Sequence, residues 1–241
     1  MALPFFFNPQ LEQSSKTIQL DEATSKHVAQ VLRMKEGEQL NLTNGKGLLA
    51  RMEITAATKK SCSVMLLESE FSAHHASRRT GIAISPVKNS SRFEWFLEKA
   101  TELGVSDIFP LLCTRTEREH FRFDRMNAIC ISAMLQSQQT WLPVLHQPIA
   151  FDELVVNSEI PLNNYTHKWI AHCTVQKKQP LVTSLTKAMK DSLILIGPEG
   201  DFTPEEITTA TKNGYHPVAL GDTRLRTETA GMIAAGLLIL C

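Results

Sequence analysis

The sequence contains no apolar run that approaches the roughly 20 residues needed to cross a lipid bilayer. Its first eight residues also lack the charged n-region and the cleavage site of a secretory signal peptide. We therefore expect a soluble protein that is not exported, has no membrane partner and is located in the cytoplasm.

Cysteine is scarce, and its spacing excludes two kinds of protein. The five cysteines are odd in number, and no two of them form a Cys-x-x-Cys pair; they are Cys62, Cys113, Cys130, Cys173 and Cys241. This pattern argues against a disulfide framework and against a zinc site. His74, His75 and His120 do not complete a ligand spacing either. We expect reduced thiols and no bound metal.

Several motifs and any excess of charge are missing as well. The sequence has no phosphate-binding Gly-x-x-x-x-Gly-Lys-Ser/Thr motif and no Gly-x-Ser-x-Gly nucleophile elbow. Residues 45–50 match the dinucleotide pattern Gly-x-Gly-x-x-Ala, but they lead into a predicted strand, whereas that pattern must open a helix. Lys and Arg total 25 and Asp and Glu total 25, so net charge does not indicate a polyanionic partner.

Residues 1–70 have the pattern of a small, mostly β domain. Alternating apolar runs predict strands at 39–43, 48–55 and 61–67, the first two joined by a tight turn at Asn44-Gly45. Asp21 is a suitable N-cap for one helix over residues 22–33, with Val31 and Leu32 in its apolar stripe. The polar, basic residues 71–80 are expected to form a linker.

Residues 81–241 alternate between strand and helix patterns. Apolar strands are expected at 81–87, 169–173, 193–196 and 216–220. Helices are expected at 92–103, where Gly104 would end the helix, and at 124–140. The alternation predicts an α/β domain built around a parallel sheet that is covered on both faces.

A first segment near the C-terminus joins a buried strand to a strongly specified helix start. The strand 193–196 runs into a Gly/Pro loop at 197–200, and Thr203, Pro204 and Glu206 then form the pattern of a capping box. Glycines between a strand end and a helix start let backbone groups approach a ligand closely. An ordinary strand-to-helix turn has the same composition, so this segment alone does not define a site.

A second segment repeats this arrangement at 220–236. A strand ends at Gly221, a polar loop follows, and a helix opens at about Thr227 with small residues along it. Such a helix can pack very closely against the sheet or a second subunit. Packing does not explain why Arg226 and Glu228 lie at the mouth of the loop.

Together the two segments resemble the RsmE family of 16S rRNA uridine-N3 methyltransferases in the SPOUT superfamily. Further residues carry the resemblance over nearly the whole chain: His27, 31–33, Gly37, Lys88, 98–105, Pro110, Gln136-Ser137 and Pro143. The resemblance implies a PUA-like domain at 1–70 and a SPOUT domain with a deep trefoil knot at 81–241. It also implies a homodimer whose active site lies at the subunit junction.

The resemblance further implies that the knot loops bind S-adenosyl-L-methionine. The implied cofactor residues are Ile196, Gly197, Glu199, Gly200, Leu220, Gly221, Leu225, Arg226, Thr229 and Ala230. The chain departs from the family pattern at Phe5, Gln139 and Thr223-Arg224, where positive charge is lost or displaced. These departures affect the binding of RNA more than the binding of the cofactor.

Methylation of N3 requires that a proton leave the uracil ring and that the resulting negative charge be stabilised. We expect Arg226 to face the uracil or its phosphate, and Glu228 or water to assist proton removal. A salt bridge from Arg226 to Glu199 or Glu228 is an equal alternative.

The expected partner is small-subunit 16S rRNA within a ribosomal particle, with the target base unstacked. Candidate phosphate contacts are Arg33, Lys35, Arg78, Arg79, Lys88 and Arg92. Two other functions stay open: an RNA-binding dimer without catalytic activity, and a SPOUT methyltransferase that acts on another RNA.

Overall fold

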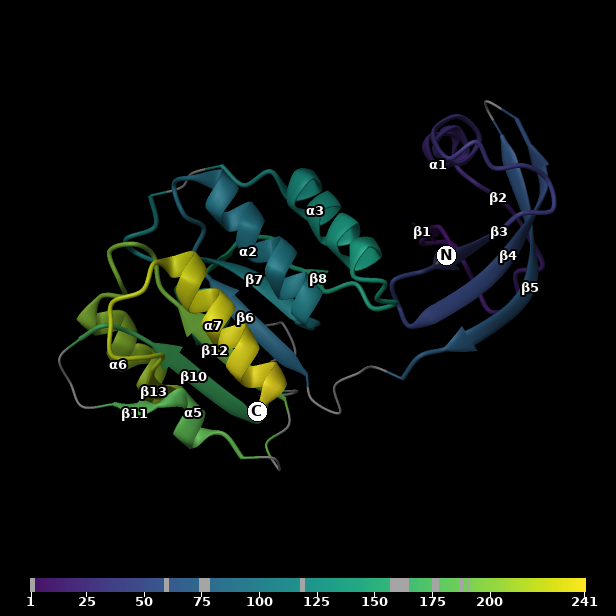
Figure 1. Ribbon diagram of the computed structural model, residues 1–241. Helices are drawn as coiled ribbons and strands as arrows, with labels where there is room; N and C mark the ends of the chain where they lie inside the picture. The colour runs from purple at the N-terminus through teal and green to yellow at the C-terminus, as the bar shows by residue number, and fades with distance from the viewer. Residues whose placement is uncertain are drawn as a thin grey trace. The chain divides into compact units, whose positions relative to one another are not determined.

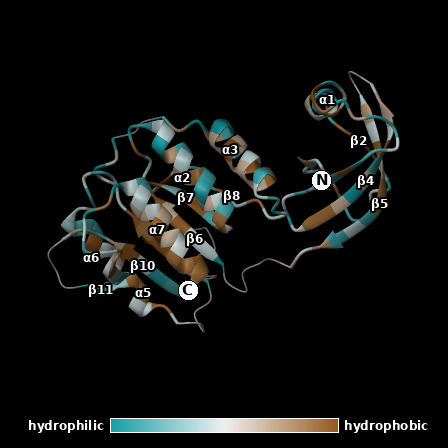
Figure 2. Ribbon diagram, in the orientation of Figure 1, coloured by the Kyte–Doolittle hydropathy of each residue, from teal (hydrophilic) through white to brown (hydrophobic). Residues whose placement is uncertain are grey.

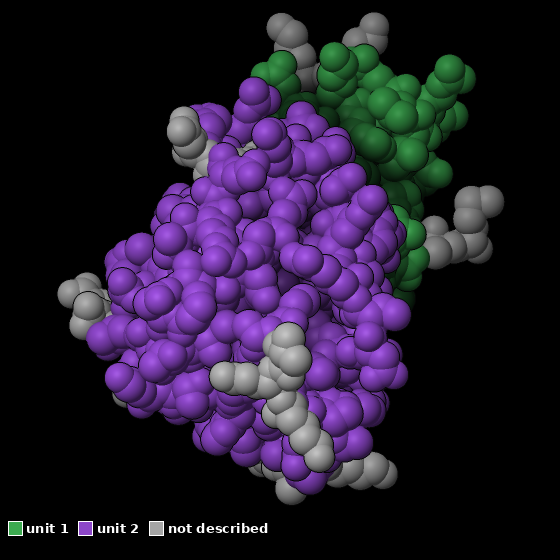
Figure 3. Space-filling view, turned by 90° about the vertical axis from the view of Figure 1, so that its left-hand side faces the viewer, with its two compact units in different colours: residues 1–75, 134–142 green, residues 76–133, 143–241 purple. Residues whose placement is uncertain are grey.

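The computed structural model describes residues 3–58, 61–73, 79–117, 120–156, 165–174, 178–186, 189 and 191–241. The chain forms two compact units, coloured separately in Figure 3. The first comprises residues 1–75 and 134–142, and the second comprises residues 76–133 and 143–241. Among the described residues, no helix is long and apolar enough to cross a membrane.

The first unit is a sheet in the order β1-β3-β4-β5-β2, in which β1 and β3 are parallel and the other pairs are antiparallel. Its elements are β1 (Phe5–Phe7), β2 (Thr17–Gln19), α1 (Glu22–Lys26), the π-helix η1 (His27–Val31), β3 (Gln39–Thr43), β4 (Leu48–Ala57) and β5 (Cys62–Phe71). The strands predicted at 39–43, 48–55 and 61–67 are therefore confirmed. Alternate residues of β4, such as Met52 and Ile54, are fully buried in the core.

The predicted helix over 22–33 is only partly correct. Asp21 caps it as expected, because its Oδ1 accepts a hydrogen bond from the Thr24 N–H at 2.9 Å. The chain then leaves α geometry at His27, and the Leu32 N–H donates to the His27 carbonyl. This wider turn shifts the register of the apolar stripe, so that Val31 and Leu32 are exposed.

Residues 134–142 belong to the first unit, although the sequence suggested one uninterrupted second domain. The helix expected at 124–140 ends at Gln136, and Trp141 then pairs with Lys46 in an isolated β-bridge. A Cβ atom on Gly47 would lie 2.6 Å from the Trp141 ring. The absence of a side chain at Gly47, whose φ is +92°, therefore makes room for this return of the chain.

The second unit is built on a sheet in the order β11-β13-β10-β12-β6-β7-β8, with β9 also beside β7, and its strand pairs are parallel (Figure 1). Its strands are β6 (Thr80–Ile84), β7 (Asp107–Leu112), β8 (Val144–Leu145), β9 (Ile149–Ala150), β10 (His167–Ala171), β11 (Gln179–Pro180), β12 (Ser192–Ile196) and β13 (His216–Ala219). Its helices are α2 (Ser90–Leu103), α3 (Phe123–Gln136), α4 (Phe151–Val155), α5 (Leu181–Ser184), α6 (Pro204–Lys212) and α7 (Thr227–Leu240). The predicted parallel sheet is confirmed.

Both faces of this sheet are covered, which explains its continuous apolar strands (Figure 2). On one face α2 and α7 lie side by side. A Cβ atom on Gly231 of α7 would lie 2.6 Å from Ile84 and 2.8 Å from the Phe96 ring. The other face contributes Leu195 to a core that includes Phe202, next to α6. The close approach of α7 fixes the position of its amino end.

Candidate functional site

The carboxyl ends of β10, β12 and β13 surround two adjoining cavities of about 290 and 310 Å³. Ala171, Ile196 and Ala219 end these three strands and line the cavities. Strand β7 lies on one side of β6. Strands β12 and β10, which come later in the sequence, lie on the other side of β6. The carboxyl ends of parallel strands are the common place for a ligand site in α/β folds.

The loop after β12 is stabilised by the capping box of α6 and by hydrogen bonds from Thr114 and Arg115. The predicted capping box of α6 is confirmed, because Thr203 Oγ1 accepts from the Glu206 N–H and Glu206 Oε2 accepts from the Thr203 N–H at 2.8 Å. Glu206 also accepts from the Thr114 N–H, and Arg115 Nη1 donates to the Gly200 carbonyl at 2.7 Å. Sequence reasoning missed both outer contacts, because they join positions more than 80 residues apart.

The loop before α7 is joined directly to the loop after β12. Thr227 Oγ1 donates a hydrogen bond to the Gly197 carbonyl at 3.1 Å, and Thr227 is buried. The structure thus brings together the two segments that the sequence singled out.

Most of the cofactor residues implied by the resemblance line these cavities. Ile196, Gly197, Glu199 and Arg226 line the first, Leu220 and Gly221 line the second, and Leu225 and Ala230 line both. Gly200 lines a third cavity of about 350 Å³, together with Lys88 and Arg115. Thr229 lies in the first turn of α7 and lines none of these three cavities.

Sequence reasoning missed the residues that follow β10. Cys173 lines both cavities, and His172 and Lys178 line the second. His172 Nδ1 lies 2.8 Å from Thr174 Oγ1 and 3.5 Å from Lys178 Nζ, and among the described residues its buried Nε2 has no hydrogen-bond partner. Burial and the charge of Lys178 lower the pKa of His172. A neutral imidazole therefore lies beside the second cavity.

The candidate catalytic residues lie at the start of α7, but their ion pairs differ from the expected alternative. Arg226 is exposed at the N-cap position and lines the first cavity. Glu228 is buried, and the guanidinium near it belongs to Arg92 of α2, at 3.7 Å. Arg92 also faces Glu199 at 3.8 Å. Arg92, which was predicted to contact an RNA phosphate, thus occupies the place beside Glu199 and Glu228 that was expected for Arg226.

The other candidate phosphate contacts are dispersed. Arg33 and Lys35 are exposed in the first unit, and Lys88 is exposed in the second, 3.5 Å from Glu117. Arg79 instead donates two hydrogen bonds to the buried carboxylate of Asp107. Arg78 lies outside the described residues. No three His, Cys, Asp or Glu side chains in the described part of the chain are grouped to hold a metal ion.

Fold and site together define an α/β protein with a ligand site at the carboxyl edge of a parallel sheet, accompanied by a small β domain. The family model of the RNA methyltransferase domain matches residues 75–239, and that of the RNA methyltransferase PUA domain matches residues 20–67. The chain belongs to this family of RNA methyltransferases.

Individual relatives agree with this assignment. A crystal structure of a probable rRNA-methyltransferase from Porphyromonas gingivalis is 37% identical, with a TM-score of 0.87 over 97% of this chain and 95% of that one. The ribosomal RNA small subunit methyltransferase E of Neisseria gonorrhoeae, solved with S-adenosyl methionine, is 26% identical, with a TM-score of 0.85 over 98% and 96%. The enzyme of the same name from Synechocystis sp. is 27% identical over 90% of this chain and 71% of its own length. The predicted PUA-like and SPOUT fold is confirmed.

Proposed function

We propose that the protein transfers a methyl group from S-adenosyl-L-methionine to N3 of a uridine in small-subunit 16S rRNA. The observation that carries this proposal is the bond between Thr227 and Gly197, which closes two glycine-bearing loops around adjoining cavities. Family membership supports RNA methylation, and the names of the relatives support a small-subunit rRNA substrate. With such a substrate, we expect the protein to be located in the cytoplasm.

The residues at the two cavities fit this cofactor. Apolar side chains of Ile196, Leu220 and Leu225 suit the faces of an adenine ring, while the backbone near Gly197 and Gly221 offers hydrogen bonds to polar edges. A Cβ atom on Gly221 would meet no atom within 4 Å, so this position leaves open space for a ligand. When bound, the cofactor supplies an electrophilic methyl group on a sulfonium.

The protein's own task is to orient the base and to remove the N3 proton. We assign the proton acceptor to Glu228, which would end the reaction as a neutral carboxylic acid. Arg226 lines the first cavity and would stabilise negative charge on the carbonyl oxygens of the uracil. Arg226 is the N-cap residue of α7 and Glu228 lies in its first turn, so both residues belong to the start of the same helix.

Unpairing of the target base is required, because N3 lies on its Watson–Crick edge. The exposed cations Arg33 and Lys35 of the first unit, and Lys88 of the second, would contact the RNA backbone. Binding through such contacts weakens as salt rises, because phosphate contacts release counterions.

We also propose that the protein acts as a homodimer and that its second unit is threaded as a trefoil knot. Helix α7 is hydrophobic along most of its length (Figure 2). Trp95 of α2 is 43% exposed and Leu240 of α7 is 76% exposed. Large apolar side chains exposed on two adjacent helices suit the surface of a second copy.

Calorimetry with S-adenosyl-L-methionine, followed by modification mapping of 16S rRNA from a deletion strain, tests the function. We expect binding at one site per chain, and one N3-methyluridine that is lost in the deletion strain and restored by the gene. Binding without loss of any rRNA methyl group would point to another RNA substrate. Absence of binding would leave an RNA-binding protein without catalytic activity.

A further inference from the structure

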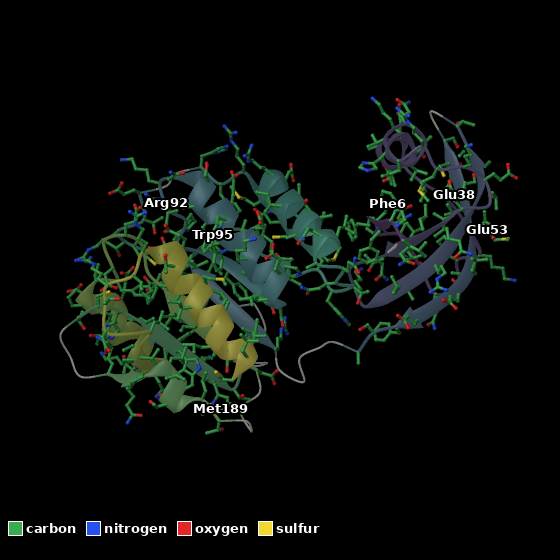
Figure 4. The ribbon with its side chains drawn as sticks, viewed as in Figure 1. Phe6, Glu38, Glu53, Arg92, Trp95 and Met189 are labelled. Carbon is green, nitrogen blue, oxygen red and sulfur yellow. The ribbon has the colours of Figure 1, made fainter. Side chains whose placement is uncertain are left out.

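One guanidinium, that of Arg92, faces two carboxylates from separate segments of the site. Arg92 lies in the first turn of α2, beside the beginning of α7 (Figure 4). Its Nη1 is 3.8 Å from Glu199 Oε1, and its Nε is 3.7 Å from Glu228 Oε1. Glu199 belongs to the loop after β12, whereas Glu228 belongs to the first turn of α7. Arg92 therefore connects the two cofactor loops electrostatically.

The negative charge of the Glu228 carboxylate is compensated by Arg92. The side chain of Glu228 is only 9% exposed, and its Oε2 is buried without a hydrogen-bond partner. An ionised carboxylate in such a place is costly unless a charge of opposite sign compensates it. The amino end of α7 favours a negative charge, but a helix terminus contributes less than a close ion pair. In the described part of the chain, Arg92 is the cation within ion-pair distance of Glu228.

The packing of α2 on α7 fixes this pair. The contact of Gly231 with Phe96 leaves no room for a Cβ atom, so the helix axes lie close together there. Glu228 precedes Gly231 by three residues and Arg92 precedes Phe96 by four, which places each on the same helix face as that contact. The small residue at 231 thus brings Arg92 and Glu228 together.

We propose that Arg92 is a positioning residue, which orients the carboxylate of Glu228 as the acceptor of the N3 proton. This inference rests on the proposed function. Arg92 acts through Glu228 and does not contact an RNA phosphate. Its second neighbour, Glu199, keeps the guanidinium centred between the two loops.

The first experiment needs neither cofactor nor RNA. Thermal unfolding is measured for the full-length wild type, R92A, E228Q and R92A/E228Q. We expect R92A to lower the unfolding midpoint by about 5 °C, because it leaves a buried charge uncompensated. Adding E228Q to R92A should recover most of that loss. A double variant whose midpoint changes by the sum of the two single changes would overturn the proposed coupling.

The second experiment measures turnover on 16S rRNA particles and the affinity for S-adenosyl-L-methionine. We expect R92A to lower kcat about tenfold with KM for RNA unchanged, and R92K, which keeps the charge, to recover most of the loss. R92A should have no further effect in the E228Q background. The matched control is R125A, which removes the bond of Arg125 to Glu94 of α2 and should leave kcat unchanged.

The outcomes separate this inference from the proposed function. A raised KM with unchanged kcat in R92A would make Arg92 a phosphate contact and overturn the inference, while the function stands. Full turnover in E228Q would overturn both the proton acceptor and the role of Arg92. A wild type that methylates no rRNA would refute the function, whereas the coupling seen in thermal unfolding would still stand.

Discussion

The two ends of the parallel sheet each hold a buried carboxylate, and the two differ in how they are paired. At the amino end, Asp107 is 1% exposed and accepts hydrogen bonds from Arg79, from Tyr165 at 2.6 Å and from His146 Nε2 at 3.0 Å. At the carboxyl end, Glu228 is 7% exposed and one of its oxygens has no partner. A fully satisfied carboxylate stabilises the fold, whereas a partly satisfied one is available for chemistry.

The hydrogen bonds at the amino end are reflected in the ionisation of the cluster. Burial alone would raise the pKa of Asp107, but the hydrogen bonds from His146, Arg79 and Tyr165 outweigh it and lower the pKa to about 2. The hydrogen bond to Asp107 raises the pKa of Arg79, and burial together with the charge of Asp107 raises that of Tyr165. Asp107, Arg79 and Tyr165 therefore each keep one charge state throughout the physiological range.

The largest expected effect is on catalysis, at the carboxyl end. E228Q should lower kcat for rRNA methylation by at least about 100-fold, because a general base contributes that much or more. Its urea midpoint should not fall, because a buried charge has been removed. Calorimetry should show unchanged cofactor affinity. A variant that is inactive only because it unfolds would contradict the distinction between the two ends.

At the amino end of the sheet we expect a loss of stability with little change in catalysis. D107N should destabilise the protein by about 3 kcal/mol, because it breaks a buried ion pair and turns a donor toward Arg79. Urea denaturation measures this loss. Methylation per folded molecule should stay within about twofold of wild type, because the site lies at the other end of the sheet. A selective loss of kcat in D107N would show that the two ends are coupled.

The third expected effect is a pH dependence that belongs to Asp107. Because its pKa falls from 3.8 to about 2 on folding, the stabilisation is fully present above about pH 4 and is lost as the pH falls toward 2. The amount is about 2 kcal/mol. Urea denaturation of wild type between pH 5 and 2 should show this decline. In D107N the decline in the free energy of unfolding should be smaller by that amount. An equal decline in D107N and in wild type would contradict the assignment of this pH dependence to Asp107.

The smallest expected effect comes from removing one hydrogen-bond donor to Asp107. Y165F removes one donor to Asp107 but leaves those of Arg79 and His146, so the loss of stability should be about 1.5 kcal/mol. Urea denaturation of Y165F in the D107N background provides the control, because the loss should be smaller there. Equal losses in both backgrounds would mean that the Tyr165 hydroxyl stabilises the fold without Asp107.

The sequence predicted the local elements because their causes lie within a few residues. The capping box at Thr203 and Glu206, and the end of α2 at Gly104, where φ is +89°, depend on neighbouring positions alone. The apolar strands 193–196 and 216–220 followed from composition, and the family that the two C-terminal motifs resemble implied that their loops bind the cofactor. The π-helix at His27–Val31 was missed, because its pattern of apolar residues also suits an α-helix.

By itself, then, the sequence determined the α/β class and the capped start of α6, since both depend on short-range patterns, and its resemblance to a known family indicated the two loops of the candidate site. Only the tertiary structure decided that Arg92 accompanies Glu228, that Arg79 is bound by Asp107 and that residues 134–142 return to the first unit. Charge pairing depends on which chain segments the strand order and helix packing bring together. Arg92 and Glu228 are 136 positions apart, and the close contact of α2 with α7 makes them neighbours.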